Sequence, residues 1–307
     1  MSAMSTKDRP NILLITTDTQ RWDTLHCMGS EFAVSPNADR LAKEGVVFRQ
    51  AHTASPVCQP ARCSLLTGQH THVHGCTENG ISRRTDLPVF TDYLKEQGYH
   101  NILVGKSHFD PIPESFDVTH TVDEKGRNTE DCYAEYLRQF GLSRTQQDIP
   151  EEHYMDTFLV GRTIEEIEKA RTGSDAPFFA FCSLISPHAP AGGKTDPPGD
   201  WGRLYDDVDL PPLNYVPGEE DRYPEHLRRL VGRPDETERE HLTEKMIRNL
   251  DNRGSVTGVG PEEIENLRRL YYGLSAYVDF PAARLITPLV ENGLRENTLV
   301  ILTSDHG

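Results

Sequence analysis

The segment 58–62, with the sequence C-Q-P-A-R, places a thiol, a rigid turn and a permanently charged guanidinium within five residues. The continuation 63–67 has the pattern of the first turns of a helix, and Gly68 provides a glycine cap. Cys58 would then lie at the helix N-terminus, where backbone N–H groups and the helix dipole favour an anion. The segment is therefore a candidate nucleophile site. The alternative is a plain buried thiol beside a surface Arg62.

Other ionisable groups directly follow short apolar runs. The groups and the runs are Asp18 after 11–17, Lys106 and His108 after 101–105, His188 after 178–185, and Asp305 with His306 after 298–303. Each run is too short for a helix and is typical of a buried parallel strand. Ligands of open α/β sheets bind at the carboxyl ends of the strands, so one edge of a sheet could gather all of these groups.

The elements that position these groups alternate along the chain. Helix patterns cover 37–44, 90–97, 154–171 and 261–292, the last with a break expected near Pro281. Alternation of strands and helices predicts an α/β fold with a large, mostly parallel mixed sheet flanked by helices. Residues 192–260 are rich in Pro, Gly and charge, which predicts a long surface excursion within a single domain that covers 1–307.

Composition narrows the class of protein. The chain has 307 residues, 36% of them hydrophobic, which is enough for one large domain with a substantial core. Its formal charge of −16 makes nucleic acid and anionic membranes poor partners, so an anionic substrate would need a locally positive site. The six cysteines show no framework spacing and are expected to be reduced. Without a visible secretory signal, we expect a cytoplasmic protein, or a periplasmic or secreted one if a leader was removed.

A histidine-rich run at 70–76 could suggest a zinc site, since His70, His72, His74 and Cys76 alternate with other residues. No paired C-x₂-C accompanies the run, and the period of two is compatible with a short exposed strand or loop. We therefore expect no zinc there.

Five motifs, taken together and in order, resemble the type I (formylglycine-dependent) sulfatase family of the alkaline-phosphatase-like superfamily. They are Asp18, the segment 58–62 with its helix ending in T-G, G-K-S-H at 105–108, P-H-A-P at 187–190, and S-D-H-G at 304–307. The resemblance implies that a formylglycine-generating enzyme oxidises Cys58. One hydroxyl of the hydrated aldehyde would then attack a small-molecule or saccharide sulfate ester, and loss of a proton from the other would release sulfate.

The resemblance also implies a metal site. Its ligands would be Asp18, Asp305, His306 and the formylglycine at position 58, and the metal Ca²⁺, with Mg²⁺ or Mn²⁺ also compatible. Where the family commonly has a second Asp, or sometimes Gln, this chain has Thr19. A hydroxyl is a weaker, neutral ligand than a carboxylate, so Thr19 would either bind a hard cation less tightly or not coordinate it at all.

The resemblance implies roles for four further residues. Arg62 would hold the modified side chain, Lys106 would bind the sulfate or the nucleophile, and His108 would be the base. His188 would bind the sulfate and protonate the leaving oxygen. Lys106 and His108 alternate along a segment expected to be extended, so both should face the same side.

Two alternatives stay open: a phosphonate monoester or phosphodiester hydrolase of the same superfamily, and an inactive fragment that keeps only the anion and metal pocket. Family members continue beyond the S-D-H-G motif with further sheet and a smaller C-terminal domain. The resemblance therefore implies that residues 1–307 are an N-terminal catalytic portion, incomplete at the C-terminus. The alcohol part of the substrate has no recognisable code in the sequence.

Overall fold

The computed structural model describes residues 9–122, 131–144, 149–188, 197–212, 222 and 261–307. The chain divides into two compact units, Met1–Tyr205 with Leu270–Gly307, and Asp206–Arg269. In the second unit, the Arg269 guanidinium donates to the Val208 carbonyl oxygen at 2.7 Å and to Glu265 at 3.1 Å. The surface excursion predicted for 192–260 lies largely outside the described residues.

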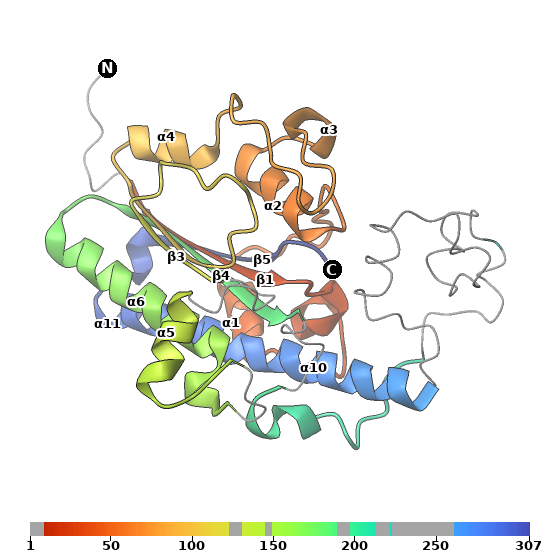
Figure 1. The fold of residues 1–307 in the computed structure, drawn as a ribbon. Coiled ribbons are helices and arrows are strands. Elements are labelled where there is room, and N and C mark those ends of the chain that lie inside the picture. The colour runs from red at the N-terminus through yellow and green to blue at the C-terminus, as the bar shows by residue number, and fades with distance from the viewer. Residues whose placement is uncertain (1–8, 123–130, 145–148, 189–196, 213–221, 223–260) are drawn as a thin grey trace. The chain divides into compact units, whose positions relative to one another are not determined.

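The first unit contains a five-stranded sheet (Figure 1). Its strands are β1 Asn11–Asp18, β2 His100–Gly105, β3 Val118–Thr121, β4 Phe178–Pro187 and β5 Thr298–Ser304. The order is β3-β2-β4-β1-β5, and every neighbouring pair is parallel. The α/β prediction is confirmed, and the four predicted strands appear within two residues of their expected ends. Strand β3 was not predicted.

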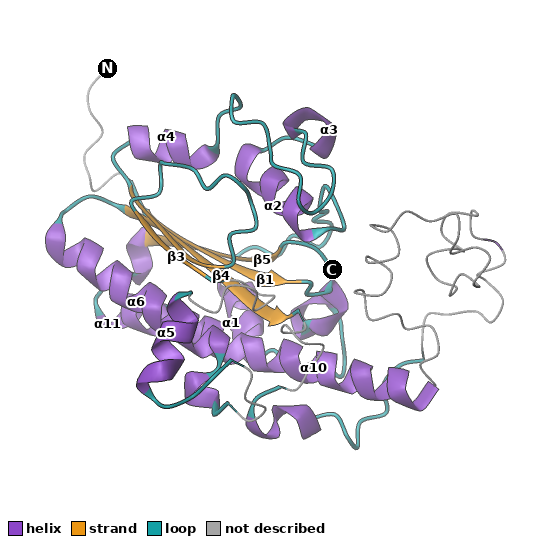
Figure 2. Cartoon of the chain, viewed as in Figure 1, coloured by secondary structure: helices purple, strands orange, loops and turns teal. Residues whose placement is uncertain are grey.

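Separate apolar clusters cover the two faces of the sheet, because side chains alternate along each strand. In β1, Leu13 and Ile15 belong to one cluster, whereas Leu14 belongs to the other. The first cluster includes residues of α5, α6, α10 and α11, and the second includes residues of α2 and α4 (Figure 2). All ten residues of β4 are buried, as expected for a central parallel strand.

The α-helices are α1 Pro36–Glu44, α2 Cys58–Thr67, α3 Thr71–His74, α4 Phe90–Glu96, α5 Cys132–Gln139, α6 Met155–Gly173, α10 Pro261–Arg284 and α11 Ile286–Glu291. Short 3₁₀ helices cover Trp22–Thr24, His26–Met28, Glu151–His153, Gly199–Arg203 and Arg295–Asn297. Helix α5 was not predicted. None of the helices in the described ranges is long and apolar enough to cross a membrane.

The predicted break near Pro281 is wrong in position, because α10 continues through Pro281 to Arg284 and a new helix begins at Ile286. Val278, Ala282 and Leu285 are buried in the core on either side of the proline. Tertiary packing therefore outweighs the loss of one helical hydrogen bond.

The helix predicted for 37–44 is α1, which begins one residue earlier, at Pro36. Ser35 makes no side-chain capping bond, and its hydroxyl instead accepts the His26 N–H at 2.9 Å. The carboxylate of Asp279, on α10, accepts the N–H groups of Asn37 at 2.9 Å and Ala38 at 2.8 Å. A distant acid thus satisfies helix donors that a local serine usually serves.

The expectation of a strand or loop at the histidine-rich run is also wrong, because Thr71–His74 forms the short helix α3. His74 is fully buried, and its Nε2 lies 2.9 Å from the Ser64 hydroxyl. Burial lowers the pKa of His74, which keeps the ring neutral in its apolar surroundings. Its role in the structure is to pack α3 against α2.

Candidate active site

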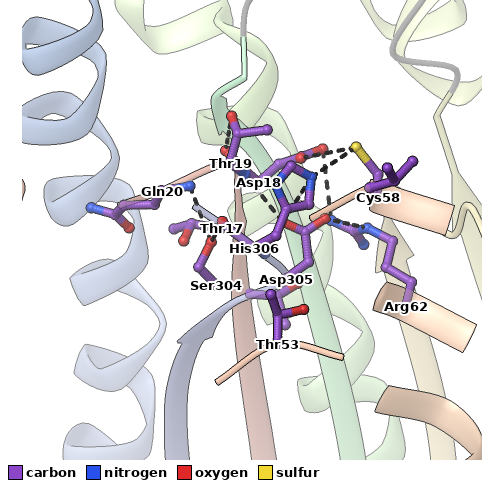
Figure 3. Close-up of polar contacts among 12 residues, drawn as sticks. Thr17, Asp18, Thr19, Gln20, Thr53, Cys58, Arg62, Ser304, Asp305 and His306 are labelled. Carbon is purple, nitrogen blue, oxygen red and sulfur yellow. Dashed lines mark hydrogen bonds and ion pairs between the residues drawn. The ribbon is translucent and has the colours of Figure 1, made fainter. Parts of the chain in front are cut away.

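Two strand ends and one helix start meet at a single point (Figure 3). Asp18 ends β1, Asp305 and His306 follow β5, and Cys58 is the first residue of α2. One ligand atom from each of these four residues lies within 4.8 Å of the others. Cys58 Sγ is 3.1 Å from His306 Nε2 and 3.8 Å from Asp18 Oδ1. The structure therefore brings together the four residues predicted to bind the metal.

Backbone contacts fix the two loops after β1 and β5 relative to each other. The Asp305 N–H donates to the Thr17 carbonyl oxygen at 3.2 Å, which continues the parallel β1–β5 pairing. Ser304 Oγ accepts the Gln20 N–H at 3.0 Å and donates to the His306 carbonyl oxygen at 2.6 Å. The ligands on the two loops are thus positioned by the sheet itself.

The buried guanidinium of Arg62 lies near both carboxylates and bonds directly to that of Asp305. Its Nε donates to Asp305 Oδ2 at 2.8 Å, and its Nη2 lies 3.7 Å from Asp18 Oδ2. Its Nη1 donates to Ser183 Oγ at 2.6 Å and to the Lys106 carbonyl oxygen at 3.0 Å. Arg62 therefore ties α2 to three strand ends, which a surface cation could not do.

The Lys106 ammonium forms an ion pair with Asp18, which is completely buried. Burial by itself would raise the pKa of Asp18, but the positive charges of Lys106, Arg62 and His188 outweigh it, so the pKa falls below its usual value. The carboxylate is therefore ionised at neutral pH. Because His188 contributes to this field, His188 lies near the same site.

Thr19 has a left-handed backbone, with φ of 58°, which is a strained conformation for a β-branched residue. Its N–H donates to Asp305 Oδ1 at 3.1 Å, and its hydroxyl donates to the Asp18 carbonyl oxygen at 2.7 Å. Tyr271 anchors the turn, because its hydroxyl donates to the Thr19 carbonyl oxygen at 2.8 Å. Coordination of a metal by Thr19 stays a prediction.

The segment after β2 differs from the extended one that the sequence predicted. His108 has φ of 46°, so the segment is not extended there and the alternation argument does not apply; that Lys106 and His108 face the same side stays a prediction. Gly105 has φ of 108°, and a Cβ there would lie 1.9 Å from the Ser183 carbonyl oxygen. Only glycine fits this close approach, which sets the direction in which Lys106 leaves the sheet.

Sequence reasoning missed two residues that support the site. Ser183, whose hydroxyl bonds Arg62, is the polar interruption of the apolar run 178–185, and that interruption was the available signal. Asp156 is fully buried in the first turn of α6 and accepts the N–H of Ile185 at 2.8 Å and that of Ser186 at 3.3 Å. In the sequence, Asp156 looks like any acidic residue in the first turn of a helix, so no feature identified it as a residue that supports the site.

The donor set fits a divalent cation. Two carboxylates and an imidazole converge, and the His306 side chain is only 8% exposed. His306 Nδ1 has no hydrogen-bond partner among the described residues. The two carboxylates are paired with Lys106 and Arg62, so a bound cation would add positive charge to the site.

Comparisons with known proteins agree with this geometry. The family model described as Sulfatase matches residues 10–307. An arylsulfatase of Clostridium perfringens is 27% identical over 97% of this chain and 63% of its own length. Iduronate 2-sulfatase of Mus musculus is 30% identical over 99% of this chain and 55% of its own length.

The fold is also shared with solved structures. A phosphonate monoester hydrolase of Agrobacterium radiobacter superimposes with a TM-score of 0.81 at 24% identity, covering 97% of this chain and 63% of that one. The chain thus spans roughly three fifths of the length of the relatives that it matches.

Proposed function

The chain belongs to the sulfatase family, and we propose that it hydrolyses a sulfate ester, R–O–SO₃⁻, to an alcohol and sulfate. The observation that carries this proposal is the meeting of Asp18, Cys58, Asp305 and His306 within 4.8 Å. Two buried cations adjoin the four residues. Such a site can accept an anion in a protein whose formal charge of −16 would otherwise repel it.

We propose that a formylglycine-generating enzyme converts Cys58 to formylglycine. The hydrated aldehyde would supply a hydroxyl nucleophile in place of the thiol. Cys58 is the first residue of α2, so the free N–H groups of the first helical turn lie beside the reacting group. Arg62, one turn further on, holds Asp305 in its orientation.

Asp18, Asp305 and His306 would hold a divalent cation, which supplies Lewis-acid polarisation of the ester when bound. Ca²⁺, Mg²⁺ and Mn²⁺ are the candidates. Lys106 Nζ is paired with Asp18 in this structure. Lys106 would exchange that carboxylate for the sulfate once Asp18 serves as a metal ligand, and so would contribute to substrate binding.

The two histidines complete the proposed machinery. His188, next to the end of β4, acts on the charge of Asp18 and would bind the sulfate and protonate the leaving oxygen. His108 would serve as the base that regenerates the aldehyde. Its left-handed backbone is the kind of local strain that accumulates at functional sites.

The decisive experiment combines intact mass, a hydrazine probe for the aldehyde, and turnover of an aryl sulfate. Protein co-expressed with a formylglycine-generating enzyme should carry the aldehyde at position 58 and be active. Cys58→Ala should lose turnover by several orders of magnitude, since a covalent nucleophile commonly contributes that much. Cys27→Ala is the matched control, because Cys27 is a free thiol outside the four-residue site. Full activity in Cys58→Ala would reject the proposal.

The second candidate is a phosphonate monoester or phosphodiester hydrolase. The fold shared with the Agrobacterium radiobacter enzyme supports it, and the Asp305–His306 pair is compatible with both chemistries. A panel of aryl sulfate, aryl phosphonate and sugar sulfate esters separates the two candidates. A higher kcat/KM for the aryl phosphonate than for either sulfate would favour the second.

A further inference from the structure

The four-residue site contains a sulfur and a nitrogen donor in direct contact, which is unusual for a hard cation. Cys58 Sγ lies 3.1 Å from His306 Nε2 and 3.8 Å from Asp18 Oδ1. Ca²⁺ is bound by six to eight oxygen ligands, and thiol sulfur is not among its usual donors. A thiolate and an imidazole together select Zn²⁺ and similar borderline ions.

The spacing of these donors fits a tetrahedral ion. Bonds of about 2.3 Å to sulfur and about 2.0–2.1 Å to nitrogen or oxygen, at a tetrahedral angle, place neighbouring ligand atoms roughly 3.5 Å apart. The two sulfur distances, 3.1 Å and 3.8 Å, lie on either side of that value. Asp305, whose Oδ1 lies 4.0 Å from His306 Nε2, would supply the fourth position.

From this geometry we propose that the unconverted chain, with Cys58 as a thiol, is a Zn²⁺-type metal protein. Oxidation of Cys58 to the aldehyde, with molecular oxygen and a thiol reductant as co-reactants and hydrogen sulfide as the leaving group, would then switch the site to harder cations. Conversion replaces the sulfur with oxygen, so the donor set changes from S, N, O, O to N and three oxygens. The oxidation state of one side chain thereby sets which metal the site accepts. The proposal uses the ligands of the proposed sulfatase site but does not depend on sulfatase turnover.

Formation of a thiolate–metal bond would release the thiol proton of Cys58 to solvent, and no electrons are transferred. The carboxylates of Asp18 and Asp305 are paired with Lys106 and Arg62 before an ion enters.

His306 provides an independent indication of a ligand. Its side chain is only 8% exposed, so more than nine tenths of it is buried. Nε2 points at the Cys58 sulfur, while Nδ1 has no hydrogen-bond partner among the described residues. A neutral ring with its proton on Nδ1 presents the Nε2 lone pair to the centre of the site, which is how histidine binds metals.

The test uses protein expressed without a maturing enzyme, with the unmodified thiol confirmed by intact mass. Titration with Co²⁺ should give a near-ultraviolet thiolate-to-cobalt charge-transfer band that saturates at one ion per chain. The band should be lost in Cys58→Ser and retained in Cys63→Ser, since Cys63 is a buried thiol of the same helix outside the site. Zn²⁺ should displace Co²⁺ at concentrations roughly 100-fold or more below those at which Ca²⁺ does.

A second measurement on the wild-type chain covers the case in which Cys58→Ser does not fold. Zn²⁺ should slow alkylation of Cys58 by on the order of tenfold, but not that of Cys27 or Cys132, as read by peptide mapping. An unchanged band in Cys58→Ser, equal displacement by Ca²⁺ and Zn²⁺, or absence of protection at Cys58 would each overturn the proposal. Matured protein that hydrolyses no ester but whose thiol form shows the band would reject the sulfatase proposal and leave this one standing.

Discussion

Replacement of Arg62 by Met would remove the cation that ties α2 to the strand ends while filling much the same volume. The guanidinium makes four polar contacts to Asp305, Ser183, Asp18 and the Lys106 carbonyl oxygen, and its side chain is 1% exposed. Removing one partner of a buried pair typically costs about 3–5 kcal/mol, because the other charge is left uncompensated. We expect the free energy of unfolding to fall by about that amount at neutral pH.

The loss should depend on pH in a defined direction. In the wild type, the pKa of Asp18 is below its usual 3.8, so its stabilising contribution is complete above that pH and is lost only as pH falls through the lower, folded-state value. Without Arg62, burial is opposed by less positive charge, so the folded-state pKa of Asp18 rises. Protonation of Asp18 then removes an uncompensated buried charge from the variant. Its loss in free energy of unfolding relative to the wild type should therefore become smaller as pH falls from 7 towards about 4.5.

Urea denaturation of the wild type and of Arg62→Met at pH 7 and at about pH 4.5 measures the two losses of stability. Arg83→Met is the matched control, because Arg83 is also buried but donates to the backbone carbonyl oxygens of Arg84 and Pro111. Its deficit should change less with pH than that of Arg62→Met, because Arg83 makes only a minor contribution to the lowered pKa of His74. A loss below about 1 kcal/mol for Arg62→Met at pH 7, or an equal loss at both pH values, would refute the assignment of Arg62 as the charge partner of the site.

Three further substitutions test individual contacts. Gly105→Ala should destabilise the protein by about 2–5 kcal/mol in urea denaturation, because the new Cβ would lie 1.9 Å from the Ser183 carbonyl oxygen. The control is Gly98→Ala, which also has a positive φ but has no atom nearer than 3.5 Å to the new Cβ, and it should cost only about 1–2 kcal/mol. Asp156→Asn should retain more stability at neutral pH than Asp156→Ala, since an amide oxygen still accepts the N–H groups at the end of β4, and equal losses would exclude that role. Thr19→Asp should raise the calorimetric affinity for Ca²⁺ in matured protein if position 19 is a ligand, whereas an unchanged affinity would make it a bystander.

The sequence predicted the ends of four strands and the helix that begins at Cys58, because both signals are local. An apolar run followed by an ionisable residue, and a glycine after a short helix, are legible without tertiary information. The capping of α1 by Asp279 could not be read this way, since acid and helix are separated by more than 240 residues. The backbone at His108 was missed for a related reason. Its left-handed conformation is imposed by the surrounding fold rather than by its own preference.

The same ion pairs that stabilise the site also bear on when a metal can enter it. Asp18 and Asp305 are both buried, and two unbalanced carboxylates there would favour the unfolded chain. Lys106 and Arg62 supply the compensating charge from within the chain, so the site can form before any cation binds. An incoming ion must then compete with Lys106 for Asp18, which lowers its apparent affinity. Metal binding is therefore expected to be an event of the folded protein and not a condition of folding, in contrast to small domains that need their metal to fold.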